Sequence, residues 1–151
     1  MKVSIIIPVY NEIAVIGNCI SSLEKQTVKS EIIIVDDGST DGSEKYATLK
    51  QKHQGPGSAR NLGASKCKGD ILVFVDADME FEADFVEKLI DPIASGKIIG
   101  TYSTTEFLLN KSDPWAVCWN LNFFGHKEKL AVSRRKNYFV KMYHATKKLL
   151  E

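Results

Sequence analysis

Three short apolar runs stand out along the chain, at residues 3–7, 32–35 and 71–75. Each is rich in β-branched residues and almost free of polar positions, which is typical of strands buried on both faces of a parallel sheet. Between the first two runs, apolar residues recur at helical spacing over residues 13–23. The alternation predicts a β-α-β crossover and therefore an α/β fold with a mainly parallel sheet flanked by helices.

Weaker patterns predict the remaining elements. A second, short helix is expected near Asp41, because Ser39, Thr40 and Asp41 are all good N-caps. Further helices are expected over residues 59–66 and 83–93, and from Ser112-Asp113-Pro114 onward, and further strands over residues 48–53 and 98–102. Within residues 127–148, a loose helical stripe of Phe139, Met142 and Tyr143, continued by Leu150, runs among basic residues and predicts a C-terminal helical region.

Composition fits one globular domain, with 151 residues of which 44% are hydrophobic and 26% charged. The net charge of +1 hides a split, since residues 1–100 hold 11 Lys/Arg against 15 Asp/Glu and residues 101–151 hold 9 against 4. An acidic half suits a bound cation and a basic half suits an anionic partner, although solvated surface explains the split equally well. The three cysteines form no C-x-x-C pair, which argues against zinc and against a disulfide framework.

The sequence shows no leader peptide and no run of the ~18 apolar residues needed to cross a bilayer, so we expect a cytoplasmic protein. The basic stretch at residues 127–148 would suit peripheral contact with the inner membrane face if it formed an amphipathic helix. A solvated helix that covers the sheet is the simpler interpretation. We expect no nucleic-acid partner.

Polar side chains follow each of the three apolar runs. Pro8, Tyr10 and Asn11 follow the first run, Asp36 and Asp37 the second, and Asp76 and Asp78 the third. Ligands of open parallel sheets bind at the carboxyl ends of the strands, so four carboxylates and a tyrosine are expected at one edge. Their repulsion favours a hard divalent cation, Mg²⁺ or Mn²⁺. Taken alone, Asp76-Ala77-Asp78 is better explained as an Asp-rich turn, and it is the apolar strand before it and the second acidic pair at Asp36 and Asp37 that favour a site.

A second constellation is Gly55-Pro56-Gly57-Ser58-Ala59-Arg60-Asn61. Glycines let a backbone approach a ligand closely, a following helix N-terminus favours anions, and Arg60 is suited to a phosphate or a carboxylate. The alternative is a plain junction between a loop and a helix. No G-x-x-x-x-G-K-[ST] occurs, and Arg60 stands where a dinucleotide fingerprint needs its third glycine, so neither a P-loop nor an NAD site is indicated.

In combination, these segments resemble family 2 glycosyltransferases. The matching pieces are VSIIIPVYNE at 3–12, IIIVDDGSTDGS at 32–43, GPGSARNLGA at 55–64 and GDILVFVDAD at 69–78, and they end in the family's D-x-D motif. The resemblance covers residues 3–93 and implies the GT-A fold, with a Rossmann-like nucleotide-binding half. It implies a nucleotide-sugar-binding half over residues 1–103 and a partial acceptor side over residues 104–151.

The resemblance also implies roles for individual residues. Pro8 and Tyr10 would line the base pocket, with Asn11 in the same nucleotide site. Asp36 would lie near the base, and Asp37 would accept a hydrogen bond from it. Arg60 would touch the nucleotide or its phosphates, Asp76 would face the ribose or the metal, and Asp78 would be the main metal ligand. The implied reaction is inverting, metal-assisted transfer of a sugar from a nucleotide-diphospho-sugar to an acceptor hydroxyl or lipid phosphate.

The sequence departs from the family in its second half. The family carries an acidic general base on its acceptor side, but the only carboxylates after Asp113 are Glu128 and Glu151, in no such motif. No general base is therefore assigned, and a truncated or non-catalytic nucleotide-sugar-binding module is the alternative function. A D-x-D phosphatase fits less well, because Glu80 stands where that motif needs Thr or Val and the motif does not follow the first strand.

Overall fold

The computed structural model describes residues 1–103, 106–107, 129–130 and 143–147. The chain divides into two compact units, one of Met1–Tyr102 with Tyr143–Glu151 and one of Ser103–Met142. In the second unit, β6 (Glu106–Phe107) pairs antiparallel with β7 (Lys129–Leu130). The first unit carries the sheet and every expected site residue.

The first unit is built on one six-stranded sheet of order β3-β2-β1-β4-β8-β5. Its strands are β1 (Val3–Val9), β2 (Glu31–Asp36), β3 (Leu49–Lys50), β4 (Ile71–Phe74), β5 (Gly100–Ser103) and β8 (Tyr143–Lys147). The first four run parallel to one another, and β8 runs antiparallel to β4. The three apolar runs therefore form the neighbouring strands β2, β1 and β4, and the expected mixed, mainly parallel α/β fold is confirmed.

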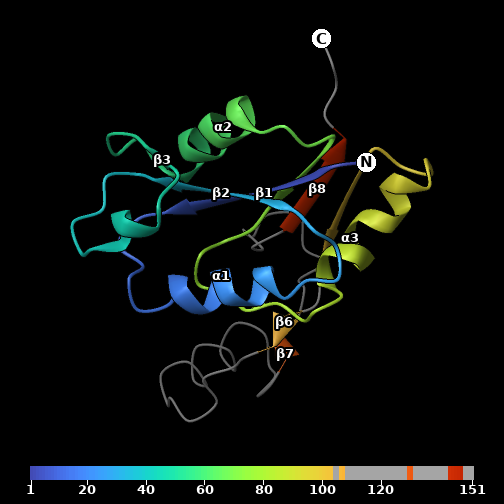
Figure 1. Ribbon diagram of the computed structural model, residues 1–151, viewed down its shortest axis with the longest axis horizontal. Helices are drawn as coiled ribbons and strands as arrows, with labels where there is room; N and C mark the ends of the chain where they lie inside the picture. Colours follow the sequence, from blue (N-terminus) through green and yellow to red (C-terminus); the bar gives the residue numbers. More distant parts are fainter. Residues whose placement is uncertain (104–105, 108–128, 131–142, 148–151) are drawn as a thin grey trace. The chain divides into compact units, whose positions relative to one another are not determined.

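Helices cover both faces of the sheet (Figure 1). Helices α1 (Ile16–Glu24) and α3 (Phe85–Ala94) cover one face and α2 (Pro56–Lys66) covers the other. Alternation along β1 explains this layering, because Val3, Ile5, Ile7 and Val9 join the core under α1 and α3. The intervening Ile6 is fully buried on the α2 side. Burial on both faces is what the near-continuous apolar runs predicted.

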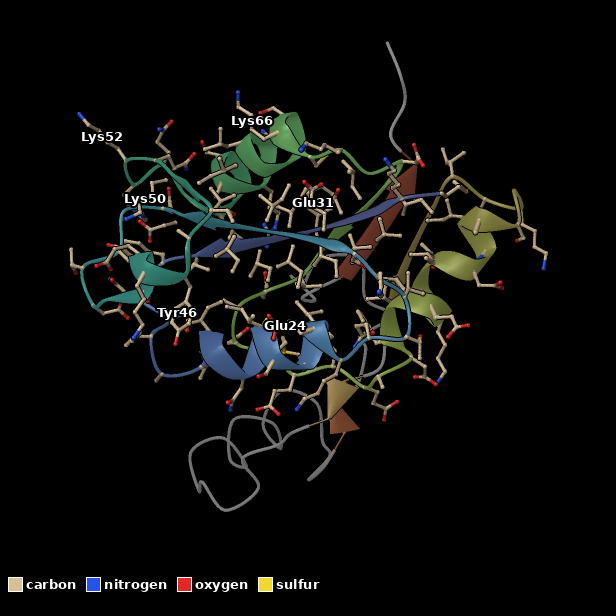
Figure 2. The ribbon with its side chains drawn as sticks, viewed as in Figure 1. Glu24, Glu31, Tyr46, Lys50, Lys52 and Lys66 are labelled. Atoms are coloured by element: carbon tan, nitrogen blue, oxygen red, sulfur yellow. The ribbon has the colours of Figure 1, made fainter. Side chains whose placement is uncertain are left out.

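Two close approaches hold α2 in place. A Cβ at Gly63 would lie 2.6 Å from Cγ2 of Ile6, so glycine lets the helix lie directly against the sheet. At the amino ends of the strands, Glu31 accepts hydrogen bonds from the Ser4 hydroxyl and the Lys68 N–H, at 2.6 and 3.0 Å (Figure 2). With this end of α2 tied down, its N-terminus lies at the carboxyl edge of the sheet.

Several expected elements differ in extent. The helix expected near Asp41 is only a 3₁₀ turn, η1 (Ser43–Tyr46). The Asp41 carboxylate accepts hydrogen bonds from Ile13 N and Ser43 N, each at 2.9 Å, so it joins the loop after β1 to the start of this turn. The strand expected over residues 48–53 shrinks to Leu49–Lys50, and the helix expected from Ala59 already begins at Pro56.

The expected C-terminal helical stripe is wrong at Tyr143–Lys147, which form strand β8. The free edge of β4 explains the difference, because pairing there gives Tyr143–Lys147 a ladder of hydrogen bonds that a local helical pattern cannot outweigh. The other residues of that stripe and the helix expected from Ser112-Asp113-Pro114 onward lie outside the described residues. No helix in the described ranges is both long and apolar enough to cross a membrane.

Candidate nucleotide-sugar site

The candidate site lies where β2, β1 and β4 end side by side. Val9 of β1 is in register with Asp36 of β2, and β4 pairs with β1 on its other side. The loop after β1 therefore lies between the loop of Asp36 and Asp37 and the loop of Asp76 and Asp78. The structure thus brings the sequence-predicted residues to one edge of the sheet, as the topology required.

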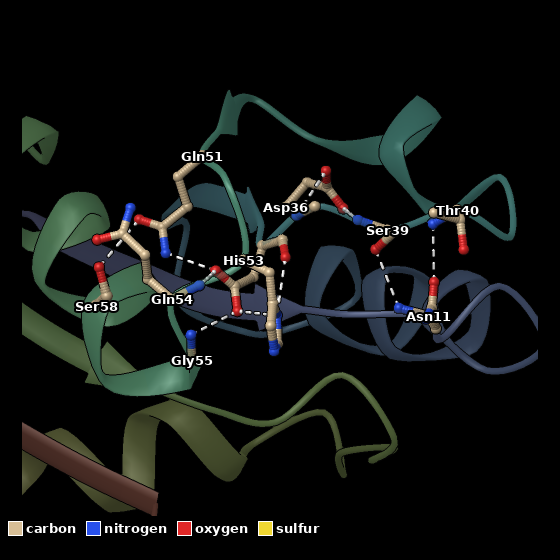
Figure 3. A network of polar contacts seen from close by, with 11 residues as sticks. Asn11, Asp36, Ser39, Thr40, Gln51, His53, Gln54, Gly55 and Ser58 are labelled. Carbon is tan, nitrogen blue, oxygen red and sulfur yellow. Dashed lines mark hydrogen bonds and ion pairs between the residues drawn. The ribbon is translucent and has the colours of Figure 1, made fainter.

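Asp37 is the centre of a dense hydrogen-bond network at the end of β2 (Figure 3). Its Oδ1 accepts from Gln51 Nε2 at 2.6 Å and from Gln54 N at 2.9 Å. Its Oδ2 accepts from Gly55 N at 2.8 Å and lies 2.9 Å from Nδ1 of His53. One carboxylate therefore holds the whole turn that leads from β3 into α2.

The same contacts keep Asp37 ionised although it is buried. Burial by itself would raise the pKa of its carboxyl group. Hydrogen bonds from the Gln51 side chain and from two backbone N–H groups, together with the adjacent His53, hold the pKa below its ordinary value. The side chain is only 3% exposed, so this is a buried charge whose cost is offset by its donors.

Tyr10 and His53 form a stacked aromatic pair at the centre of this edge. Their ring centroids are 4.1 Å apart with the planes inclined by 29°. Both remain open to solvent, with Tyr10 45% exposed and the His53 side chain 57% exposed. The backbone of His53 fits there because Gly38, with φ +82°, has no Cβ, which would lie 3.0 Å from His53 N. The sequence patterns did not single out His53, since no motif spacing marked it.

The loop after β1 is fixed to the loop after β2 by Asn11. This residue has a φ of 56°. Its N–H donates to Ser39 Oγ at 3.0 Å, and its Oδ1 accepts from Thr40 N at 2.8 Å. Asp36 accepts from the N–H groups of Gly38 and Ser39 at 3.3 and 3.2 Å. Asn11 and Asp36 therefore shape these loops in the described structure.

The D-x-D loop after β4 is more open. Arg60 Nη2, from α2, donates to Asp76 Oδ1 at 2.7 Å, with both side chains partly exposed. Asp78 is exposed. Beneath the loop, the Cys19 thiol lies 3.6 Å from the Asp76 carbonyl oxygen. Burial and the nearby Asp78 raise the pKa of Cys19 to about 12, so this thiol stays protonated.

The sequence expectation of four carboxylates around a cation is met only in part. Among the described residues, no three His, Cys, Asp or Glu side chains gather as a metal-binding group. Asp36 and Asp37 are engaged by loop donors at the end of β2, whereas Asp76 and Asp78 lie beyond β1 at the end of β4. Pro8, which lies in β1 opposite Val35, is partly buried between these two groups of carboxylates.

Comparison with known proteins decides the family. A model of glycosyl transferase family 2 matches residues 4–146. The chain belongs to this family. The D-x-D phosphatase alternative therefore has no support left.

Relatives of this family member include the glycosyltransferase GlyA of Streptococcus pneumoniae, 36% identical over 104 residues, which cover 61% of this chain and 15% of GlyA. Among solved structures, S. aureus TarS 1-349 in complex with UDP-GlcNAc matches with a TM-score of 0.57 and 30% identity, over 66% of this chain and 33% of that one. The Pyrobaculum calidifontis mannosyltransferase PcManGT, solved with GDP-Man and Mn²⁺, shares the fold with a TM-score of 0.60 at 23% identity, over 66% and 34% of the two chains. The chain spans about a third or less of each of these proteins.

Proposed function

We propose that this chain binds a nucleotide-diphospho-sugar at the carboxyl edge of its sheet and serves inverting sugar transfer to an acceptor hydroxyl or lipid phosphate. The observation that carries the proposal is the 2.7 Å ion pair between Arg60 and Asp76. It joins the GPGSARN segment to the D-x-D loop through two residues that are 16 positions apart in sequence. In support, TarS, which shares 30% identity, has been solved with UDP-GlcNAc.

The base and ribose are proposed to bind around the loops after β1 and β2. Tyr10 is exposed and aromatic, which suits stacking on a base. Pro8 would form the floor beside it. Asn11 and Asp36 would hold the shape of the pocket through the loop contacts described above. Asp37 would act in the same pocket, and Asp76 would face the ribose.

A divalent cation, Mg²⁺ or Mn²⁺, is proposed for the D-x-D loop. Asp78 and Asp76 would hold it, and an exposed carboxylate beside a second carboxylate is the donor set that such hard cations prefer. Among the residues that the structure describes, no third carboxylate, histidine or cysteine joins them in a metal-binding group, and the donor's phosphate oxygens would complete such a site. The ion would neutralise charge on the departing diphosphate.

Arg60 and the N-terminus of α2 are proposed to orient that diphosphate. Gly55 and Gly57 have open space where a Cβ would stand, so a ligand can approach the backbone there. With the leaving group held on this side, the acceptor oxygen would attack the anomeric carbon from the opposite face, which inverts it. The acceptor side is proposed for residues 104–151 and the donor side for residues 1–103.

Isothermal calorimetry tests the donor and metal roles together. UDP, GDP and dTDP would be titrated into the chain with Mn²⁺ and again with EDTA. We expect binding of at least one nucleotide that weakens strongly in EDTA, because the cation bridges carboxylate and diphosphate. Equal affinity in both buffers would remove the metal from the proposal, and no binding of any nucleotide would remove the donor site.

A second candidate function is donor binding without turnover by these 151 residues. It is favoured by the sequence after Asp113, where only Glu128 and Glu151 carry carboxylates. A positioned general base contributes about 10²–10⁴-fold to the rate, so transfer is expected to be poor without one. Product chromatography with sugar and lipid-phosphate acceptors checks this, and efficient transfer would show that the base has been overlooked.

We also propose a cytoplasmic location with peripheral membrane contact. Sedimentation with anionic vesicles tests the membrane contact.

A further inference from the structure

The segment that leads from the D-x-D loop into α3 is held by α1 and by the turn that follows α1. Figure 1 shows this segment, residues 79–84, running beside α1 to the start of α3. The Phe81 N–H donates to Ser22 Oγ at 3.1 Å. A second bond runs from Gln26 Nε2 to the carbonyl oxygen of Glu82, at 2.7 Å. The backbone just after the D-x-D motif is therefore fixed by residues 59 and 56 positions earlier in the chain.

Gln26 is a buried amide whose N–H donors and oxygen are all engaged. The residue is 9% exposed. Its Nε2 donates to the carbonyl oxygens of Ser22 and Glu82 at 3.1 and 2.7 Å, and its Oε1 accepts from Val86 N at 2.9 Å. Val86 lies in the first turn of α3, where backbone N–H groups have no partner within the helix. The N-cap residue Asp84 makes no side-chain cap hydrogen bond. Gln26 therefore caps α3 from another part of the chain and fixes where the helix begins.

Ser22 contacts the same segment from the last part of α1. Its hydroxyl donates to the Cys19 carbonyl oxygen at 2.8 Å and accepts from Phe81 N at 3.1 Å. The adjacent Ser21 is exposed, because successive side chains of a helix point in different directions. Helix α1 therefore presents one of two neighbouring serines to the segment after the D-x-D motif.

The D-x-D loop is held on its other side by β1. Val75 N donates to the Ile6 carbonyl oxygen at 3.2 Å, just beyond the last paired residue of β4. Asp78 is exposed and lies between this contact and the contact of Phe81 with α1. An exposed side chain on a loop is placed largely by the backbone that carries it, and a group that is already in place loses less entropy when it binds a ligand. The two attachments therefore limit where the carboxylate of Asp78 can lie.

We propose that Ser22 and Gln26 are positioning residues for the cation ligand Asp78. They act through the backbone of residues 79–86, which they hold so that the carboxylate is in place before a cation arrives. Both side chains are uncharged, so they fix the loop without adding a charge beside its carboxylates. The proposal rests on the proposed metal-assisted donor binding and names the residues that support it. Loosening these contacts should weaken the part of nucleotide binding that depends on the cation and leave the rest unchanged.

The test separates binding that depends on the cation from binding that does not. Calorimetry would measure UDP and GDP in Mn²⁺ and again in EDTA, and the quantity compared is the ratio of the two dissociation constants for one nucleotide. Ser22→Ala removes the acceptor of Phe81 N, whereas Ser22→Thr keeps a hydroxyl. Gln26→Met keeps the length of the side chain without its amide. Ser21→Ala is the matched control, because it makes the same substitution at the exposed neighbour on the same helix.

We expect Ser22→Ala and Gln26→Met each to lower this ratio about tenfold, the lower end of the effect of losing a contact behind a metal ligand, with the affinity in EDTA unchanged. Ser21→Ala and Ser22→Thr should keep the wild-type ratio. If Gln26→Met does not fold, Ser22→Ala decides the question.

Two outcomes would overturn the inference while the donor site stands. One is a wild-type ratio in both Ser22→Ala and Gln26→Met. The other is an equal loss of affinity in Mn²⁺ and in EDTA, which would mean that these residues only stabilise the fold. A wild type that binds equally well in both buffers overturns the proposed metal role, and the inference with it. A wild type that binds neither nucleotide overturns the proposed donor site itself.

Discussion

The loops that follow β2 and β4 both carry carboxylates, but these carboxylates differ in their burial and in their hydrogen-bond partners. At the end of β2, Asp37 is buried and surrounded by protein donors. At the end of β4, Asp76 is only partly buried and pairs with Arg60 from a different element, while Asp78 is exposed. The two loops lie on either side of β1, so the difference is local and does not come from different parts of the fold.

The difference separates residues that shape the candidate site from residues that we propose bind its ligand. For a buried carboxylate that accepts hydrogen bonds at all its positions, those bonds offset the free energy of desolvation. Replacing it lowers the stability of the fold, because the donors lose their acceptor. An exposed carboxylate contributes little to folding and can exchange its water for a cation. We therefore expect mutations at β2 to act on stability and mutations at β4 to act on binding, and the predictions below test that division.

The largest effect is expected for Asp78→Ala. Loss of the proposed main cation ligand should weaken nucleotide binding in Mn²⁺ by about 100-fold, which corresponds to about 2.7 kcal/mol of charge stabilisation. The melting temperature without ligand should stay the same or rise, because a repulsive exposed carboxylate is removed. Glu80→Gln, an exposed position of the same loop, is the control and should bind normally. A large fall in apo melting temperature would make Asp78 structural.

Asp37→Asn should destabilise the fold more than any carboxylate change at β4. The amide places an NH₂ against protein donors and leaves them without an acceptor, which costs about 2 kcal/mol or more. Thermal unfolding should show the melting temperature falling by at least about 5 °C. If Asp37→Asn unfolds at the wild-type temperature, the network around Asp37 is not what holds the turn.

Arg60→Ala should lower nucleotide affinity more than it lowers the stability of the fold. The Arg60–Asp76 pair is partly exposed, so its loss should cost the fold no more than about 1 kcal/mol. Nucleotide affinity should nevertheless fall about tenfold, because the proposed charge-assisted bond from Arg60 to the diphosphate would be lost. Arg60→Lys should recover part of the affinity. A stability loss as large as that of Asp37→Asn would erase the distinction between the two loops.

The smallest effect is a pH dependence carried by Asp37. Its pKa is lowered in the folded state, so its stabilisation is complete above the unfolded Asp pKa of about 3.9 and is lost as pH falls through the lower folded value. Urea unfolding from pH 7 down to pH 3 should show the wild type losing its advantage over Asp37→Asn below about pH 4. If the difference in stability between the wild type and Asp37→Asn is constant over this pH range, the ionised carboxylate of Asp37 is not what stabilises the fold.

The sequence predicted the sheet and the edge that carries the site because those features are local and repetitive. Apolar runs buried on both faces identify β1, β2 and β4 whatever packs on them, and the polar residues after each run follow from the strand direction. The family motifs then pointed to Arg60 and Asp76, which do meet in the structure.

What the sequence could not predict depends on contacts made across the fold. Tyr143–Lys147 form a strand because β4 has an open edge, which no local pattern reveals. The Asp41 carboxylate accepts hydrogen bonds from both Ser43 N and Ile13 N, and the contact with Ile13, 28 positions earlier, cannot be seen in a local pattern. His53 contacts Asp37 and Tyr10, which lie 16 and 43 positions away in the chain. Such a site residue becomes visible only after the loops are placed.

The pairing of β4 with β8 also sets an order of events during synthesis. Phe74 of β4 pairs with His144 of β8, 70 positions later in the chain. One edge of the apolar strand β4 therefore has no partner strand until β8 has been synthesised. At about 5–20 residues per second, that wait lasts roughly 4 to 14 s. During this time β1 and β2 can already pair, but the outer edge of β4 offers unpaired backbone groups to any neighbouring nascent chain. Slow translation between these two strands would prolong that exposure.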